Sequence, residues 1–364
     1  MCKMKKALIA MSGGVDSSLA AKLMVDDGFE CIGCTMKLYD NEDVGIERSR
    51  TCCSLDDVED ARSVAYKLGM HFYVLNFTQD FHETVIRRFI RSYEKGITPN
   101  PCIDCNRYMK FGKLFERAEI LGCDYVVTGH YARIEEHNGI FVLKKALDET
   151  KDQSYVLYSM TQQQLAHTKF PLGNLQKTEV RAIAEQNGFV NADKPDSQDI
   201  CFVPNGDYAG VIELQTGSRP VPGSFVDTRG NELGRHKGII HYTVGQRRGL
   251  GIPGPEPLYV CKICPQDNTV VLGKKDELFT DRAYAEEVNW ISGKCPEQSF
   301  RCKVKIRYRH PEQWATVTPE SENTVSIVFN NAQRAVAPGQ AAVFYDGDVV
   351  LGGGTLTAEA DGKK

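Results

Sequence analysis

The sequence predicts an α/β protein that opens with a doubly wound parallel sheet and ends in two small β-domains. Three observations support this prediction. Short apolar runs alternate with helical patterns over the first 200 or so residues, as in strands joined by crossover helices. A loop rich in glycine and serine directly follows the first strand, where doubly wound sheets bind ligands. After about Asn205, helical periodicity fades and glycines and prolines punctuate short strands.

The parallel sheet is expected to form from four early apolar segments. We predict strands at Ala7 to Met11, Cys31 to Lys37, His71 to Phe77 and Asp124 to Thr128. Helical spacing predicts helices at 17–26, 55–68 and 81–94, and Thr178 is expected to cap a last one that runs through Asn187. A strand is predicted at Leu258 to Ile263. The expected domains are residues 1–205 for nucleotide binding and catalysis, a small β-domain at 206–278 and a β-barrel-like domain at 279–364.

Composition limits the class of protein. A chain of 364 residues is long enough for two or three domains. No apolar run approaches the roughly 20 residues needed to span a bilayer, and the run from Ala7 to Met11 is short for a signal peptide. We therefore expect a cytoplasmic protein with no membrane partner. The chain has thirteen cysteines, and this odd number in a long chain suggests reduced thiols. Because the net charge is −4, any surface that binds nucleic acid must be a local basic patch.

The segment Ser12–Ser18, here called the phosphate loop, lies between the first strand and a helix. Helix N-termini present unpaired N–H groups to anions. Gly13 and Gly14 let the main chain approach a phosphate, and Asp16 could hold a magnesium-bound water or orient the loop. No lysine follows the glycines, so a Walker A type of phosphoryl transfer is disfavoured.

The motif Ser-Gly-Gly-Val-Asp-Ser is similar to the PP-loop of ATP pyrophosphatases, which have the adenine nucleotide alpha hydrolase-like fold. Those enzymes cleave ATP between its α and β phosphates and leave an adenylated substrate. The resemblance implies ATP and Mg²⁺ as cofactors. The loop alone leaves the substrate open, since synthetases of guanylate, asparagine, argininosuccinate and NAD carry similar loops.

Cysteines mark two further segments, 100–106 and 196–202. Arg107 and Lys110 could favour the thiolate of nearby Cys105. The order of motifs resembles the tRNA-specific 2-thiouridylase (MnmA/TrmU) family across essentially the whole chain. The matching segments are 12–18, 98–111, 128–133, 151–155, 196–202 and 245–249.

The resemblance implies ATP-dependent 2-thiolation of the wobble uridine of tRNA. ATP would adenylate the C2 oxygen of the base, and a persulfide on Cys201 would deliver sulfur, forming 2-thiouridine with release of AMP and pyrophosphate. Cys105 would release the sulfur or close a disulfide with Cys201. The implied partners are tRNA and a persulfide donor, either a cysteine desulfurase or a sulfur carrier protein.

The same resemblance implies the contacts of both substrates. The ATP-binding residues would be Ala10, Met11, Ser12, Gly13, Gly14, Val15, Asp16, Ser17, Met36 and Gly129. The tRNA-binding residues would be Asn100, Pro101 and Cys102 beside the target base, with His130, Lys151, Asp152, Gln153, Arg307, Tyr308 and Gln340. His130 also follows a predicted strand end, where a doubly wound fold gathers ligand groups.

One position departs from the commonest family pattern, because Cys102 stands where aspartate is frequent. Cys102, Cys105 and Cys201 could then hold a [4Fe-4S] cluster with one open iron, or zinc, instead of serving persulfide chemistry. The adjacent Cys52 and Cys53 are interpreted as loop or half-buried cysteines. Two rival functions stay open: a PP-loop ligase for a small molecule, and an RNA-binding module with a metal cluster and a vestigial nucleotide loop.

A basic strand is predicted at 300–309. Alternation places five cations on one face and apolar side chains on the other, which suits a phosphate backbone. Tyr308 would point away from Arg307, so either the strand ends there or this contact does not transfer. The helix at 81–94 is a second cationic candidate. The five cations of the strand are Arg301, Lys303, Lys305, Arg307 and Arg309, and those of the helix are Arg87, Arg88 and Arg91.

Overall fold

A five-stranded sheet in the order β3-β2-β1-β4-β7 organises the first part of the chain, and all its strands are parallel. The computed structural model describes residues 4–40, 55–195 and 199–358. The four predicted strands are confirmed with ends shifted by at most one residue, and β7 was missed because it is only two residues long. The strands are β1 (Lys6–Ala10), β2 (Glu30–Lys37), β3 (His71–Asn76), β4 (Tyr125–Val127) and β7 (Thr168–Lys169).

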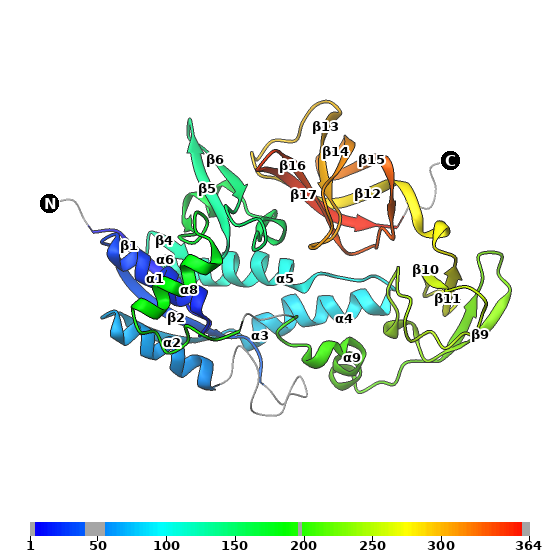
Figure 1. Ribbon diagram of the computed structural model, residues 1–364, viewed down its shortest axis with the longest axis horizontal. Helices are drawn as coiled ribbons and strands as arrows, with labels where there is room; N and C mark the ends of the chain where they lie inside the picture. The colour runs from blue at the N-terminus through cyan, green and yellow to red at the C-terminus, as the bar shows by residue number, and fades with distance from the viewer. Residues whose placement is uncertain (1–3, 41–54, 196–198, 359–364) are drawn as a thin grey trace.

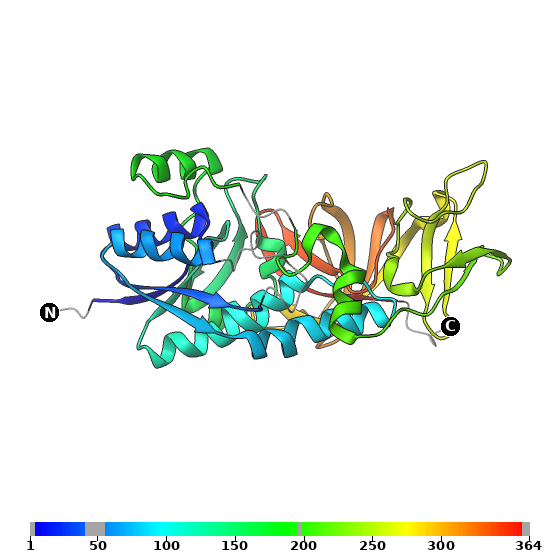
Figure 2. The ribbon, with the colours of Figure 1, turned by 90° about the horizontal axis from the view of Figure 1, so that it is seen from below.

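Helices cover both faces of this sheet, as Figure 2 shows in a view along its edge. On one face, α1 (Val15–Asp26), α2 (Leu55–Lys67) and α8 (Lys177–Gln186) pack on Ala7, Ile9 and other sheet residues. The helices between residues 78 and 121 and α9 (Tyr208–Thr216) cover the other face, with Leu8 and Val126 in that core. Burial on both faces explains why the central strands β1 and β4 are apolar runs without alternation. The predicted doubly wound fold is confirmed.

Two long helices on the second face contain wide π-helical turns. The first consists of α3 (Thr78–Phe81), a π-helical stretch (His82–Ile86) and α4 (Arg87–Glu94). The second consists of α5 (Pro101–Asp104), a π-helical stretch (Cys105–Lys113) and α6 (Leu114–Ile120). Asn100 caps the second helix by accepting from the Cys102 N–H at 3.2 Å, and Pro101 occupies its first turn. The first cysteine-bearing segment, 100–106, therefore starts a helix.

Two other helices differ from the prediction. Thr178 does not cap α8. Gln176 does, in reciprocal hydrogen bonds with Glu179 that satisfy two donors of the first turn. The helix α9 was missed, although Asp207 caps its start and Gly217 ends it in the left-handed conformation. The remaining helical segments are Ser154–Leu157, α7 (Gln162–Ala166), Pro204–Gly206, Ile239–His241 and Asp276–Leu278.

The middle of the chain folds into a four-stranded sheet in the order β10-β11-β8-β9. It has its own core around Phe225, Val260 and Val270. The strand predicted at Leu258 to Ile263 is confirmed as β10. The strands are β8 (Gly223–Val226), β9 (Glu232–His236), β10 (Tyr259–Cys264) and β11 (Thr269–Gly273).

A six-stranded antiparallel barrel follows in the order β12-β15-β14-β13-β16-β17 and closes by the pairing of β12 with β17 (Figure 1). The predicted barrel-like domain is confirmed. The predicted strand at 300–309 is shorter than expected, because β13 ends at Lys305 and a turn joins the His310 N–H to the Arg307 carbonyl. The strands are β12 (Phe279–Trp290), β13 (Phe300–Lys305), β14 (Gln313–Ser321), β15 (Thr324–Arg334), β16 (Ala341–Asp346) and β17 (Val349–Thr357).

The barrel and the first part of the chain share structure. The hairpin of β5 (Ala132–His137) and β6 (Ile140–Lys145) extends the barrel sheet by pairing with β17. The buried hydroxyl of Tyr155 donates to the Ala341 carbonyl at 2.9 Å, in a core that also contains Val343. The expected division at 205/206 and 278/279 stays a prediction. Over the described ranges, no helix combines the length and apolar character that crossing a membrane requires.

Candidate functional site

A large cavity of about 1700 Å³ gathers residues from all three parts of the chain. The phosphate loop forms part of its wall. The start of α5, the segment 149–153 and the turn after β13 form other parts. Thirteen of the predicted site residues line this cavity: Ser12, Gly14, Val15, Asp16, Asn100, Pro101, Cys102, Lys151, Asp152, Gln153, Arg307, Tyr308 and Gln340.

The phosphate loop has the geometry of an anion site. Gly14 is the N-cap of α1 and no side chain caps that helix, so its first N–H groups stay available where Gly14 and Val15 meet the cavity. Gly13 has φ +77°, and a Cβ there would overlap the backbone of Asp57. Ser17 fixes the loop, because its hydroxyl accepts from the Ser12 N–H at 3.1 Å and donates to the Gly14 carbonyl at 3.0 Å. These residues fit a polyphosphate.

The lysine that the loop lacks is supplied by another element. Lys177, the first residue of α8, places its Nζ 2.6 and 2.8 Å from the two carboxylate oxygens of Asp16. The Tyr131 hydroxyl donates to the same carboxylate at 2.8 Å. Lys177 is only 8% exposed, yet it lines the cavity beside the loop. Sequence reasoning missed it because 161 residues separate it from Asp16.

A second missed lysine joins the loop to α2. Lys194 Nζ lies 2.5 Å from Asp57 and 2.8 Å from Asp60, and it donates to the Gly13 carbonyl at 3.4 Å. Lys194 also lines the cavity. Although burial lowers its pKa, the hydrogen bonds to the two carboxylates outweigh burial, and the pKa is raised. Lys194 is therefore charged and holds the phosphate loop against α2.

Six predicted nucleotide positions lie behind the cavity wall. Met11 and Ser17 are buried, and Ala10 and Met36 pack on the apolar core beneath the sheet. A Cβ at Gly129 would lie 2.8 Å from the Ser17 nitrogen, so this glycine lets the end of β4 press against the phosphate loop. Contact of any of them with ATP stays a prediction. The six are Ala10, Met11, Gly13, Ser17, Met36 and Gly129.

Cys105 and Cys201 pack against the same apolar cluster, and the exposed Cys102 lies in the cavity wall. The neighbour of Cys201, Ile200, also lines the cavity, and the Tyr39 hydroxyl donates to the Cys201 carbonyl at 2.6 Å. Both predicted catalytic cysteines are thus partly buried against the core beneath the parallel sheet, and neither lines the cavity. Residues 52, 53 and 196–198 lie outside the described residues.

The cations that follow Cys105 are engaged elsewhere. Arg107 faces Glu287 of β12 at 3.6 Å, and Lys110 Nζ lies 3.2 Å from the His130 ring. The expectation that both cations favour the Cys105 thiolate stays a prediction.

The cysteines do not fit a metal cluster in this conformation. Among residues 4–40, 55–195 and 199–358, no three His, Cys, Asp or Glu side chains are placed to hold a metal ion. Cys102 faces solvent, whereas Cys105 and Cys201 are partly buried against the core. We therefore derive no step through an iron–sulfur cluster or through zinc.

Three of the predicted tRNA-binding residues form hydrogen bonds that stabilise another part of the cavity wall. Gln340 donates to the Thr98 carbonyl at 2.9 Å and thereby fixes the loop before Asn100. The Tyr308 hydroxyl donates to the Asp152 carbonyl at 3.2 Å. Arg307 donates to the Ala335 carbonyl at 2.6 Å, and its Nε is buried without a partner among the residues described. Because the strand ends at Lys305, Arg307 and Tyr308 both reach the cavity.

His130 is the exception among the predicted RNA contacts. It is 6% exposed, packs on Phe111 and does not line the cavity. Burial and the charge of Lys110 hold its pKa well below the usual value. Since an ammonium only donates, Nε2 accepts from Lys110, and Nδ1–H donates to the Thr128 hydroxyl at 2.7 Å. Contact of this buried side chain with RNA stays a prediction.

The five cations of the predicted basic strand separate into two groups. Lys305, Arg307 and Arg309 line the cavity, and burial lowers the pKa of Lys305 and of Arg307. Arg301 and Lys303 come earlier in β13, and their charged groups lie over the ring of Trp314. On the second cationic candidate, the helix at 81–94, Arg88 lies 3.5 Å from Asp104 and 3.6 Å from Glu287, so carboxylates neutralise part of it.

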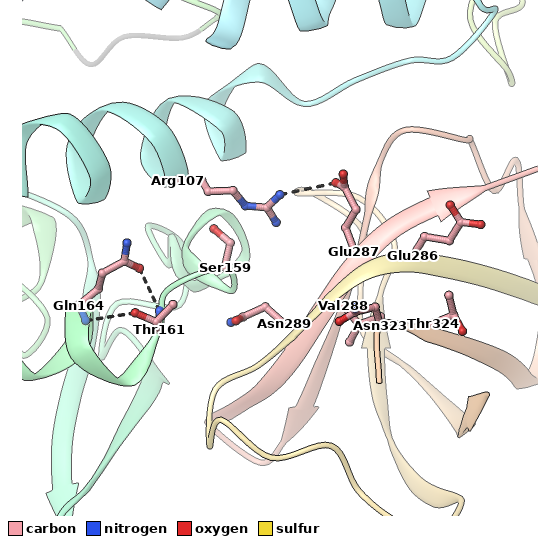
Figure 3. Close-up of a pocket in the computed structure, with 10 residues that line it drawn as sticks. All are labelled: Arg107, Ser159, Thr161, Gln164, Glu286, Glu287, Val288, Asn289, Asn323 and Thr324. Atoms are coloured by element: carbon pink, nitrogen blue, oxygen red, sulfur yellow. Dashed lines mark hydrogen bonds and ion pairs between the residues drawn. The ribbon is translucent and has the colours of Figure 1, made fainter. Parts of the chain in front are cut away.

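A smaller cavity of about 570 Å³ lies between the barrel and the helices that follow Cys105. Figure 3 shows Arg107 extending toward Glu287 across it. Glu287 sits at an irregularity of β12 with φ +51°. The ion pairs of this residue link the barrel to the cysteine-bearing helix.

Comparison with known proteins identifies the family. Family models match residues 5–205 (tRNA methyl transferase HUP domain), 212–274 (tRNA methyl transferase PRC-barrel domain) and 280–356 (Aminomethyltransferase beta-barrel domain). A protein of Clostridioides difficile named tRNA-specific 2-thiouridylase MnmA is 50% identical over 97% of this chain and 98% of its own. A protein of the same name from Symbiobacterium thermophilum is 50% identical over 97% of this chain and 92% of its own.

Among solved structures, a 4-thiouridine synthetase–RNA complex with bound ATP is 18% identical, covering 58% of this chain and 52% of its own, with a TM-score of 0.33. That score is too low to support an argument. The near full-length identities decide the assignment, because two chains half identical over nearly their whole length share the domains that surround the large cavity. The chain belongs to the tRNA-specific 2-thiouridylase family of PP-loop enzymes.

Proposed function

We propose that this protein thiolates a tRNA uridine at C2 in an ATP-dependent reaction, and that the target is the wobble uridine. One observation carries the proposal. The phosphate loop, the cysteine-bearing start of α5 and the basic turn after β13 line the same cavity. A reaction that joins ATP cleavage, sulfur chemistry and RNA needs these three components within reach of one base. In this scheme residues 1–205 carry the chemistry, and residues 206–278 and 279–364 form two further domains, the last of which holds RNA.

ATP supplies the activation step. The uridine C2 oxygen attacks the α-phosphate, the bond between the α and β phosphates breaks, and pyrophosphate leaves with the electron pair. The free N–H groups of α1 and the ammonium of Lys177 suit the negative charge that develops on pyrophosphate. Asp16 would hold a water of a bound Mg²⁺, and the ion would supply further positive charge to the phosphates. Ser12, Gly14 and Val15 are the direct ATP contacts that we propose.

Sulfur arrives as a persulfide on Cys201. Its terminal sulfur attacks C2, and AMP departs with the C–O electron pair. Cys105 then attacks the Cys201 sulfur of the mixed persulfide, so that the S–S bond breaks and 2-thiouridine is released. A Cys105–Cys201 disulfide remains, which a cellular thiol must reduce before a persulfide donor reloads Cys201. Two observations support these roles: both cysteines are partly buried against one apolar cluster, and their chain neighbours Cys102 and Ile200 line the cavity.

The RNA end combines contact residues and positioning residues. We propose Lys151, Arg307 and Tyr308 as contacts to tRNA, because they line the cavity and carry positive charge or an exposed ring. Asn100, Pro101 and Cys102 border the target base. Gln340 and Asp152 position the wall through their hydrogen bonds, and neutral His130 positions Lys110.

The test is a reconstituted reaction under anaerobic conditions with ATP, Mg²⁺, unmodified tRNA and a persulfide donor. We expect 2-thiouridine by nucleoside mass spectrometry and one AMP for each thiouridine. Cys105→Ala and Cys201→Ala should abolish thiouridine, while Cys295→Ala, a partly buried barrel cysteine, should not. Lys177→Met should lower AMP formation roughly 10- to 100-fold, the effect of losing one or two charge-assisted hydrogen bonds.

Two outcomes would overturn the proposal. Formation of AMP that needs no RNA, without thiouridine, would indicate a ligase for a small molecule. Thiouridine formation that survives in Cys201→Ala would remove the persulfide role from this residue. The identity of the modified position follows from sequencing the thiolated RNA.

A further inference from the structure

The chain has two tryptophans, and the structure places them in opposite environments. Trp290 is 8% exposed in the barrel core, where its Nε1–H donates to the Glu322 carbonyl at 3.4 Å. Trp314 of β14 is 47% exposed on the outer face of the same barrel. It stands directly opposite Lys303 on the neighbouring strand β13. An exposed indole therefore lies on the outer face of the barrel, next to β13.

Two cations lie against this exposed ring. The Arg301 guanidinium is 5.0 Å and the Lys303 ammonium 5.9 Å from its centre, distances typical of cation–π contacts. Neither cation takes part in an ion pair with any carboxylate in the portion of the chain that the structure describes. Both charges remain available to a phosphate, and the indole offers an aromatic surface beside them.

This surface continues the basic wall of the large cavity. Arg301, Lys303 and Lys305 alternate along β13 with buried residues, so they share its outer face. Lys305 lines the cavity, and Arg301 lies four residues earlier, about 13 Å along the strand. A strand of RNA that leaves the cavity at Lys305 meets Lys303, Trp314 and Arg301 within the reach of one to three nucleotides.

We infer that Arg301, Lys303 and Trp314, here called the Trp314 platform, bind an unpaired nucleotide adjacent to the target uridine, with the base stacked on the indole and the phosphates held by the two cations. The inference rests on the proposed function and extends it to a second RNA contact outside the cavity. Aromatic rings next to cations bind single strands in this way, because every base has a stacking face, whereas bases inside a duplex are already stacked.

Intrinsic fluorescence tests the stacking directly. Unmodified tRNA titrated into the wild-type protein should quench tryptophan emission. The same titration with Trp314→Phe should leave the emission of buried Trp290 nearly unchanged while binding persists. A fully base-paired RNA duplex of equal length should not quench wild-type emission, because it offers no unpaired base.

Affinity measurements test the energetic role. Trp314→Ala should weaken tRNA binding about tenfold, as the loss of one base stack does. Arg301→Ala combined with Lys303→Ala should lower the slope of log K against log salt by about 1.5, since two phosphate contacts are lost. The matched control is Arg282→Ala, an exposed arginine on β12 across the barrel from β13, which should change neither quantity.

The two proposals fail in different ways. If wild-type protein thiolates tRNA but Trp314→Ala and the double variant bind with unchanged affinity and salt slope, the platform is wrong and the proposed function stands. If wild-type protein neither binds nor thiolates tRNA, both are wrong. Quenching by a purified persulfide donor protein, with none by tRNA, would assign this surface to a protein partner and overturn the inference.

Discussion

At the scale of single residues, His130 shows how burial decides the role of a side chain. Its position after β4 was predictable from the sequence, but its environment was not. The ring is enclosed by Phe111 and Phe170 and faces the ammonium of Lys110, so it stays neutral. The spacing of motifs carries no information on the burial of His130, which depends on the π-helical stretch Cys105–Lys113 and on Phe170 after β7. This explains why we propose that His130 positions Lys110, whereas the sequence predicted a contact with RNA.

The lowered pKa of His130 has a consequence for stability. Above the unfolded pKa of about 6.5 the histidine is neutral in both states and its contribution is fully present. As the pH falls below that value, His130 binds a proton in the unfolded chain but stays neutral in the folded protein. The free energy of unfolding then decreases by about 1.4 kcal/mol per pH unit until the folded pKa is reached.

Replacing His130 should therefore flatten the pH dependence of stability. We expect the change in Tm between pH 7.5 and pH 5.5 to be smaller in His130→Gln than in the wild type, although the variant is less stable at pH 7.5. His71→Gln, at an exposed position of the edge strand β3, serves as the control and should keep the wild-type slope. An unchanged slope in His130→Gln would mean that this ring titrates normally.

At the scale of elements, the sequence predicted what is local. Strands and helices with strong apolar patterns, such as β2 and α2, were found within one or two residues. The Asn100–Pro101 pair is a readable N-cap and first-turn signal, although no helix was predicted there. The end of β13 at Lys305 was not readable, since the alternation continues to Arg309 while the backbone turns away from the sheet. Contacts between elements, such as that of Lys177 with Asp16, left no sequence signal.

The contact between β4 and the phosphate loop can be tested at Gly129. A Cβ there would lie 2.8 Å from backbone atoms of both Asp16 and Ser17. Gly129→Ala should lower the free energy of unfolding by about 1–3 kcal/mol and raise the KM for ATP, because the loop must shift. Gly254→Ala is the control, since its Cβ would meet only the Glu256 carbonyl at 3.6 Å. Equal effects of the two substitutions would contradict this account.

At the scale of the whole molecule, two of the three parts share a hydrophobic core and the third has a core of its own. Figure 1 shows the barrel above the long helices of the first part, with the β5–β6 hairpin beside it. One core unites Tyr155 and Phe111 of the first part with Val343 and Tyr345 of the barrel. The middle sheet keeps a core of its own around Val270. We expect the first part and the barrel to unfold together.

Two fully buried valines make this testable. Val343→Ala and Val270→Ala each remove two methyl groups from a side chain with no exposed surface, at a cost of about 1–3 kcal/mol. By hydrogen exchange, Val343→Ala should lower protection in the parallel sheet and in the barrel, whereas Val270→Ala should lower it in β8–β11 alone. Loss of protection confined to the barrel in Val343→Ala would show that the two parts unfold independently.

The shared core also determines how late in translation the residues around Tyr155 can become buried. Tyr155 and its hydrogen-bond partner Ala341 are 186 residues apart. At roughly 5–20 residues per second, a ribosome needs on the order of 10–40 s to translate that interval. During this time the aromatic residues around Tyr155 have left the exit tunnel while the strands that cover them do not yet exist. The nascent chain must therefore keep an apolar surface exposed until its last strands appear, which makes it a substrate for chaperones at that stage.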